Sequence, residues 1–320
     1  MTVHAVGVVL HPARDSAEAV DAVLAWAARK GADVFGIGSE IVRLNCAATP
    51  LTPAEIGPRS DLLVSIGGDG TMLRTMRLAD GQRAPVLGVN LGRLGFLAEV
   101  DVPELPAALS AIDAREFVTE PRMAIDCYVS DHDGEPGPAL AGGQRVTAFN
   151  DIAVVRVPGD KLASVAVYAG GQPFVSYVAD AVIVATPTGS TAYSFSAGGP
   201  IVSPAVEALL VTPASPHSAY NRGVVLSVAD TVSLEVLPDS GRLAIEVDGR
   251  VVGYAAPGDF LDITPRPAAA RVVRLGHTSF YQRARRKLGI TDSAGITQPI
   301  PLPTPQRVVS ASPEKSFPEA

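Results

Sequence analysis

The sequence predicts two folded parts, a parallel α/β domain followed by a β-sandwich-like domain. Strand-like and helix-like segments alternate through the first third of the chain, which is typical of an open parallel sheet. After Pro121 the chain consists mostly of short strands with turn signals, which is typical of a sandwich or barrel. We therefore assign residues 1–120 plus 276–290 to the α/β domain and 121–275 to the β domain. The Pro- and Ser-rich residues 291–320 are expected to form a disordered tail.

The composition is that of a soluble globular protein with a substantial core. Of 320 residues, 47% are hydrophobic and 18% are charged. The formal net charge of −7 gives no support to nucleic-acid binding or to a polybasic membrane contact. The two cysteines, Cys46 and Cys127, match neither a disulfide framework nor a zinc pattern. The first residues look like a strand rather than a signal peptide, and no apolar run approaches the ~20 residues of a membrane span, so we expect a cytoplasmic protein.

Four apolar segments in the first third predict buried parallel strands, and the segments between them predict helices. The strands are AVGVVL, ADVFGIG, DLLVSI at residues 61–66, and APVLGVN. Ser16 is expected to cap a first helix that ends at Gly31. Thr71 is expected to open a second helix that continues through residues 72–78.

Beyond Pro121 the pattern predicts a series of strands and one further helix. We expect strands near residues 146–157, 164–169, 173–178, 181–185, 224–228, 232–237, 243–247, 260–263 and 272–275. The acidic stretch 131–144 is expected to be a hairpin insertion. A basic helix is expected at about residues 279–288.

One glycine-rich turn combines features of a phosphate site with a carboxylate. The segment Gly67-Gly68-Asp69-Gly70-Thr71 follows a predicted strand and precedes a predicted helix, where backbone N–H groups bind anions. In the alternative interpretation, the glycines only supply positive φ angles in a tight turn. A carboxylate at the carboxyl end of a parallel strand can accept a proton or hold a metal ion. Amides for the phosphate and a base for the attacking hydroxyl are what phosphoryl transfer requires.

The usual phosphate-binding motifs are absent from the sequence. There is no Gly-x-x-x-x-Gly-Lys-Ser/Thr motif, and no Gly-x-Gly-x-x-Gly follows the first strand. Lysine occurs only at positions 30, 161, 287 and 315. A kinase of this sequence is therefore expected to rely on amides, arginine and the Mg²⁺ carried by its nucleotide, with no metal site of its own.

A second stretch, ATPTGSTAYSFSAGGPIVSP at 185–204, is rich in hydroxyl side chains and glycine. Its composition favours a surface loop. The functional alternative is a loop of short donors and amides around a polar ligand, with Tyr193 as a flat apolar platform.

These motifs together resemble the NAD kinase family. The resemblance covers about residues 60–290 and rests on GGDGTMLR, LGRLGFLAEV, the pair Asn150-Asp151, TPTGSTAYSFSAGGPIVSP and TPASPHSAYNR. GGDGT alone is less specific, since diacylglycerol and sphingosine kinases carry a similar motif. The resemblance implies an N-terminal Rossmann-like α/β domain, a C-terminal β domain with NAD between them, a last helix that returns to the first domain, and a homodimer or homotetramer.

The resemblance also implies a reaction and a set of site residues. The reaction is transfer of a phosphoryl group from ATP or polyphosphate to the 2′-hydroxyl of the adenosine ribose of NAD, or of NADH, which makes NADP(H). Asp69 would accept the proton, while Gly67, Gly68, Gly70 and Thr71 would form the phosphate loop. The NAD-binding residues implied are Asp69, Gly70, Arg74, Asn150, Asp151, Lys161, Asp180, Thr188, Thr191, Ala192, Tyr193, Ser194, Phe195 and Ser196. For Arg74 the alternative is a solvated helix charge.

Four positions depart from the family pattern. Asp151 stands where glutamate is frequent, Val178 where a basic residue is frequent, Ala181 for a glycine and Gly223 for a proline. These departures leave two other functions open. One is a non-catalytic NAD(P) sensor of the same fold, and the other is a lipid or sphingoid-base kinase, which the polar 186–196 loop disfavours.

Overall fold

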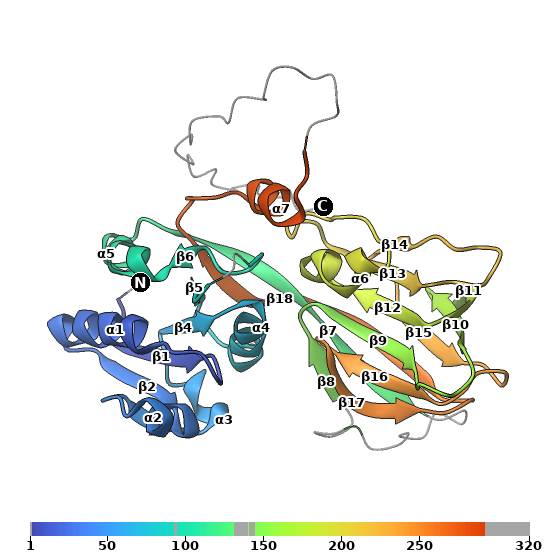
Figure 1. Ribbon diagram of the computed structural model, residues 1–320, viewed down its shortest axis with the longest axis horizontal. Coiled ribbons are helices and arrows are strands. Elements are labelled where there is room, and N and C mark those ends of the chain that lie inside the picture. Colours follow the sequence, from blue (N-terminus) through green and yellow to red (C-terminus); the bar gives the residue numbers. More distant parts are fainter. Residues whose placement is uncertain (1, 93–94, 131–139, 141–144, 292–320) are drawn as a thin grey trace, which may run out of the picture.

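The computed structural model describes residues 2–92, 95–130, 140 and 145–291 (Figure 1). The predicted tail at 291–320, apart from its first residue, lies outside these residues. So does the predicted acidic insertion at 131–144, apart from Leu140.

Five parallel strands form the N-terminal sheet in the order β3-β2-β1-β4-β5. They are β1 (Ala5–Leu10), β2 (Asp33–Ile37), β3 (Thr49–Leu51), β4 (Leu62–Gly67) and β5 (Val86–Asn90). Four of them confirm the predicted strands, and β3 was not predicted. The strand order reverses between β1 and β4, so their carboxyl ends flank the crevice in which open α/β sheets bind ligands.

Helices cover both faces of this sheet. On one face, α1 (Ala17–Lys30) and α5 (Leu105–Ala114) share a core with the strands. On the other face lie α3 (Pro53–Ile56) and α4 (Asp69–Leu78). The helices α2 (Gly38–Leu44), α3 and α5 were not predicted from the sequence, nor were the short elements β6 (Val100–Asp101) and η1 (Val102–Glu104).

The boundaries of the two predicted helices differ in detail from the expectation. Ser16 precedes α1, but its side chain makes no capping hydrogen bond, whereas Gly31 ends the helix in the left-handed conformation as predicted. The second helix, α4, begins at Asp69 rather than at Thr71. Asp69 therefore belongs to the first helical turn, and its side chain starts from the positive end of the helix dipole.

The C-terminal part is a sandwich of two antiparallel sheets, as predicted. One face consists of the strands β11-β10-β15-β18 with β7 and β8, and the other of β14-β13-β12-β9-β16-β17. Their bounds are β7 (Val118–Ser130), β8 (Arg145–Ala148), β9 (Asp151–Arg156), β10 (Ala163–Ala169), β11 (Gln172–Ala179), β12 (Ala181–Ala185), β13 (Ala208–Ala214), β14 (Val224–Ser227), β15 (Val232–Val236), β16 (Leu243–Val247), β17 (Arg250–Ala255) and β18 (Phe260–Arg274). A large core of fully buried aliphatic side chains fills the space between the two sheets.

The structure differs from the predicted strands at two places in this part of the chain. The single strand expected at 146–157 is broken at Phe149 and Asn150 into β8 and β9. The two strands expected at 260–263 and 272–275 are one long strand, β18, which pairs with β15, β7 and β5. Because of β18, one continuous 12-stranded sheet runs through both halves of the protein.

The last helix, α7 (Phe280–Leu288), lies above the junction of the two halves (Figure 1). Ser279 and Gln282 form a capping box that starts the helix one residue after the predicted boundary. The carboxylate of Glu99 accepts hydrogen bonds from the N–H groups of Leu275, His277 and Thr278, which fixes the start of α7 to the N-terminal half. Among the described residues, no helix has the length and apolar character that crossing a membrane requires.

Candidate functional site

The glycine-rich turn connects β4 to α4, and its glycines do not have positive φ angles. Positive φ occurs at other glycines, but not at Gly67, Gly68 or Gly70. The interpretation of this segment as a tight turn that needs positive φ is therefore wrong. A Cβ at position 67 would collide with the side chain of Thr71, whereas positions 68 and 70 face open space. The missing side chains at 68 and 70 leave the first-turn amides of α4 accessible.

The carboxylate of Asp69 turns away from its own helix and toward the segment 95–97. Its two oxygens accept hydrogen bonds from the N–H groups of Phe96 (3.0 Å) and Leu97 (3.1 Å). The ammonium group of Lys287, on the last turn of α7, lies 3.0 Å from Asp69 Oδ2. Gly95 permits this approach, because any Cβ there would occupy the position of the carboxylate.

Asp69 lines a cavity of about 240 Å³, which we call the Asp69 cavity. Its lining residues come from five separate segments of the chain: Asp69, Phe96, Leu97, Asn150, Thr188, Thr191, Ala192 and Lys287. Five of these, namely Asp69, Asn150, Thr188, Thr191 and Ala192, are among the residues expected from the sequence to bind one ligand. The structure thus brings together a carboxylate, an amide, two hydroxyls and one ammonium group.

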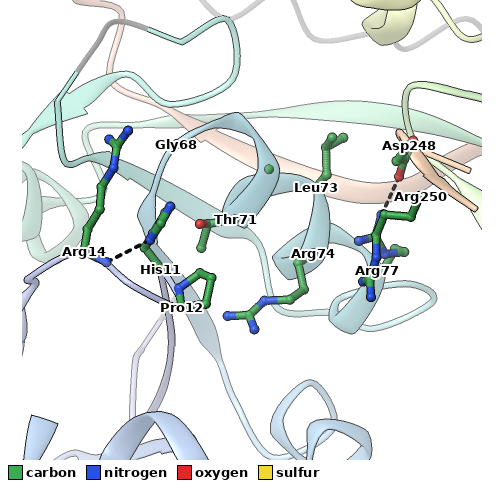
Figure 2. A pocket seen from close by; sticks show the side chains of 11 residues that line it. His11, Pro12, Arg14, Gly68, Thr71, Leu73, Arg74, Arg77, Asp248 and Arg250 are labelled. Atoms are coloured by element: carbon green, nitrogen blue, oxygen red, sulfur yellow. Dashed lines mark hydrogen bonds and ion pairs between the residues drawn. The ribbon is translucent and has the colours of Figure 1, made fainter. Parts of the chain in front are cut away.

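A second cavity, of about 660 Å³, is lined by Gly68, Gly70 and Thr71 of the same turn (Figure 2). We call it the arginine cavity, and its lining residues are His11, Pro12, Arg14, Gly68, Gly70, Thr71, Leu73, Arg74, Arg77, Asp248 and Arg250. The segment after β1, the first turn of α4 and the start of β17 all contribute to it. Burial, with the charges of Arg14, Arg43 and Arg74, lowers the pKa of His11. Four arginines around accessible helix N–H groups make this cavity suitable for a polyanion.

The structure places Arg74 in the arginine cavity rather than beside Asp69. Its guanidinium donates a hydrogen bond to the carbonyl of Leu10 (2.6 Å) and pairs with Glu40. Glu40 in turn accepts a hydrogen bond from the N–H of Leu10. Arg74 is a residue of α4 whose guanidinium is held at the end of β1 by these contacts. The alternative of a solvated helix charge is therefore wrong.

A buried carboxylate, Asp248, sets the position of Asn150. Asp248 has a φ of 47° in the turn between β16 and β17, and its carboxylate accepts hydrogen bonds from the N–H groups of residues 149, 150 and 151. Arg77, at the end of α4, forms an ion pair with the same carboxylate. From the opposite side, the N–H of Thr186 donates to the carbonyl of Asn150 (2.8 Å). Gly189 packs so closely on this carbonyl that a Cβ there would clash with it.

The hydroxyl-rich stretch 186–204 is not a surface loop. It contains two short helices, η2 (Thr188–Thr191) and α6 (Tyr193–Ser196), and the side chains of Thr186, Ser190 and Ser194 are fully buried. Their hydroxyls are used within the protein, on Phe149, Val202 and Thr212 respectively. The buried hydroxyls therefore shape this segment, and Thr188, Thr191 and Ala192 face the Asp69 cavity.

The other expected site residues lie outside the lining of the two cavities. Asp180 forms a partly exposed ion pair with Arg156 (2.6 Å). Lys161, Phe195 and Ser196 are exposed, whereas Asp151 and Ser194 are buried and Tyr193 is partly buried. Their expected contacts with NAD stay predictions.

Several residues that line the two cavities were not predicted from the sequence. Phe96 and Leu97 belong to the quoted motif LGRLGFLAEV, but no residue of it was selected. His11 and Arg14 directly follow β1, and the order of the strands could have identified them. Lys287, Asp248 and Arg250 reach the site only through contacts far apart in the chain, and no local signal marks them.

We predict that Asp248→Ala destabilises the protein by about 2–4 kcal/mol, because it leaves Arg77 and three backbone N–H groups without their acceptor. Asp248→Asn is the matched control, since asparagine tolerates the positive φ and keeps one acceptor oxygen. We expect a smaller loss for this control. Urea unfolding of both variants measures the difference, and an unchanged midpoint for Asp248→Ala would contradict the assigned function of this carboxylate.

We also predict that stability falls with rising pH because of Asp151. Burial, with the neighbouring charge of Asp248 as a second cause, raises the pKa of Asp151 from 3.8 to about 7. Between these two values the folded state binds more protons at this carboxyl than the unfolded state, so the free energy of unfolding decreases as pH increases. The effect is at most about 4 kcal/mol and is complete above pH 7.

The variant Asp151→Asn should therefore gain stability relative to the wild type at pH 8 but not at pH 4. Its side-chain oxygen can still accept the hydrogen bond that the N–H of Tyr193 donates to Asp151. Melting temperatures of both proteins across this pH range test the prediction. If the two melting temperatures differ by the same amount at pH 4 and at pH 8, the titration of Asp151 does not cause the difference in stability.

Comparisons with known proteins agree with this organisation. Residues 6–117 match the family model of the ATP-NAD kinase N-terminal domain, and residues 149–275 match that of the ATP-NAD kinase C-terminal domain. NAD kinase 1 of Streptomyces avermitilis is 40% identical, with 92% of this chain and 89% of that protein aligned. The NAD kinase of Desulforamulus reducens is 36% identical, with 88% and 96% aligned.

Two solved structures share the fold over most of the chain. Yeast NADH kinase complexed with NADH superposes with a TM-score of 0.81 at 24% identity, and the match covers 92% of this chain and 90% of that one. The NAD kinase from Archaeoglobus fulgidus in complex with ATP gives a TM-score of 0.65 at 25% identity, with 89% and 97% covered. Since both domain models match and relatives are this similar over nearly their full length, the chain belongs to the NAD kinase family.

Proposed function

We propose that this protein is an NAD kinase that phosphorylates the 2′-hydroxyl of the adenosine ribose of NAD, with Asp69 as the proton acceptor. The observation that supports this mechanism is the division of the GGDGT turn between two cavities. Asp69 lines the Asp69 cavity, while Gly68, Gly70 and Thr71 line the arginine cavity. The base suits the hydroxyl that accepts the phosphoryl group, and the anion-binding turn suits the phosphates of the donor.

In the proposed reaction the ribose hydroxyl lies in the Asp69 cavity and the donor phosphates lie in the arginine cavity. The hydroxyl oxygen attacks the terminal phosphorus, and its proton passes to a carboxylate oxygen of Asp69. The bond between that phosphorus and the bridging oxygen of the donor breaks, and the electron pair leaves with the donor. Positioning and electrostatic stabilisation supply most of the rate in such transfers, so the fixed orientation of Asp69 is the main contribution of the turn.

The acceptor nucleotide is proposed to contact the polar side chains of the Asp69 cavity. Asn150, Thr188 and Thr191 offer donors and acceptors there, and the backbone of Asn150 is held from both sides. Asp151, Asp180, Tyr193, Ser194, Phe195, Ser196 and Lys161 are proposed as further NAD contacts on the family resemblance. NADH is proposed as a second acceptor, because both forms carry the same adenosine ribose.

The donor is proposed to be ATP, with polyphosphate as an alternative of the same chemistry. The related enzyme from Archaeoglobus fulgidus was solved in complex with ATP. We propose that Mg²⁺ enters with the phosphates of the donor, because in phosphoryl transfer the metal ion bridges the phosphate oxygens of the nucleotide and neutralises their charge.

The alternatives from the sequence receive less support. A lipid or sphingoid-base kinase needs an apolar acceptor cleft, whereas the Asp69 cavity is small and has mostly polar lining residues. A non-catalytic sensor would not need a carboxylate oriented by two N–H groups.

We also propose a cytoplasmic homodimer or homotetramer formed through the β domain, where Phe174 and Val225 are exposed.

Replacement of Asp69 by asparagine is expected to lower kcat by about 10²- to 10⁴-fold, because it removes the base. The amide nitrogen would also face one of the N–H groups of Phe96 and Leu97, so a modest loss of stability is expected. Conversion of NAD to NADP with ATP and Mg²⁺ measures kcat, and thermal unfolding with NAD titration shows whether the variant is folded and binds. A folded variant within a few-fold of the wild-type rate would exclude Asp69 as the base.

Arg250→Met is expected to raise KM for ATP about 3- to 10-fold with little change in KM for NAD, because Arg250 lines only the arginine cavity. The matched control is Arg271→Met, which removes an exposed arginine outside both cavities. Saturation kinetics with each substrate tests the assignment. A larger effect on KM for NAD than for ATP would reverse the roles of the two cavities.

A further inference from the structure

Lys287 is a charged residue of the Asp69 cavity that the proposed reaction has not yet used. It comes from the last turn of α7, 218 residues away from Asp69 in the sequence. Its ammonium nitrogen lies 3.0 Å from Asp69 Oδ2 and 4.4 Å from the centre of the Phe96 ring. The N–H of Phe96 donates to the same oxygen, so the base, the lysine and the ring form one cluster.

The pair between Lys287 and Asp69 is suited to changing partners. The side chain of Lys287 is 34% exposed and that of Asp69 is 27% exposed. Ion pairs with this much solvent contribute little to stability, so their separation costs little. The aromatic ring beside the ammonium favours a cation at this position whether or not the carboxylate is charged.

The proposed chemistry removes the charge partner of Lys287 at the moment of transfer. When Asp69 takes the hydroxyl proton it becomes neutral, and the ammonium group loses its counter-charge. At the same moment a phosphoryl group with negatively charged oxygens bonds to the hydroxyl oxygen that gave up the proton. Enzymes of this reaction class usually place a lysine or arginine on the phosphoryl group in transfer.

We propose that Lys287 is a catalytic residue that pairs with Asp69 before the reaction and with the phosphoryl group during transfer. The inference rests on the proposed function, because it needs a hydroxyl and a phosphoryl donor at these cavities. The proton moves from the hydroxyl to Asp69, the new O–P bond forms as the donor's P–O bond breaks, and Lys287 keeps all its protons. It supplies the positive charge that a P-loop lysine supplies in other kinases, a residue that the glycine-rich turn of this chain does not contain.

The test compares Lys287→Met, Lys287→Arg and the control Arg286→Met in the full chain. Arg286 is an exposed neighbour on the same helix and lies outside both cavities. We expect Lys287→Met to lower kcat about 10²- to 10³-fold, as loss of one transition-state donor does, with less than a 3-fold change in NAD affinity. Lys287→Arg should recover at least a tenth of the wild-type kcat, and Arg286→Met should match the wild type.

The possible results separate this inference from the proposed function. If the wild type makes no NADP from NAD and ATP, the proposed function fails. If the wild type is active and Lys287→Met keeps its kcat, or exceeds it, Lys287 does not assist the transfer and this inference alone is overturned. An equal loss of kcat in Arg286→Met would also overturn it, because the cause would then be damage to α7. If Lys287→Met does not fold, Lys287→Gln replaces it under the same criteria.

Discussion

The carboxylate of Asp69 occupies the first turn of a helix whose N–H groups face an anion-binding cavity. Without further contacts, such a carboxylate would itself be attracted to those N–H groups and would compete with phosphate. The N–H groups of Phe96 and Leu97 hold it on the opposite side. Arg274 of β18 donates a hydrogen bond to the carbonyl of Leu97 (2.8 Å) and pairs with Glu120 of β7. The direction of one carboxylate therefore depends on two strands that extend into the β domain.

Helix α4 carries Asp69 at one end and, at the other end, a residue that helps to position the opposite wall of the Asp69 cavity. Its first residue is Asp69, and its last turn carries Arg77, which pairs with Asp248 171 residues further along the chain. Because Asp248 fixes the backbone at Asn150, one helix positions a carboxylate of the α/β domain and an amide of the β domain. The continuous strand β18 keeps the two halves in register with each other. The site is thus assembled by rigid elements, which suits a reaction that depends on positioning.

The sequence was sufficient for the parts of the fold that local pattern determines. Buried strands of uniform apolar character, such as DLLVSI, and the helix at about residues 279–288 were predicted because their signals lie within a few residues. The break between β8 and β9 was missed because the residues on both sides continue a strand-like pattern, and the interruption is imposed by Asp248 from a distant turn. Lys287 was missed for the same reason. In the sequence it is one of several basic residues of the last helix, and only the packing of α7 over the junction (Figure 1) brings it to Asp69.

The distribution of charge in the site differs from that of the whole chain. A net charge of −7 opposes the approach of ATP or polyphosphate, yet four arginines line the arginine cavity, and among the described residues carboxylates pair with only two of them, Arg74 and Arg77. Local concentration of charge in a cleft outweighs the net charge at a distance, because solvent and salt screen exposed charges beyond about 10 Å. The Asp69 cavity needs a net charge near zero, since an excess of positive charge there would draw the donor phosphates to the base. One ammonium paired with one carboxylate satisfies this requirement, and the turn whose residues line both cavities separates the cationic cavity from the nearly neutral one.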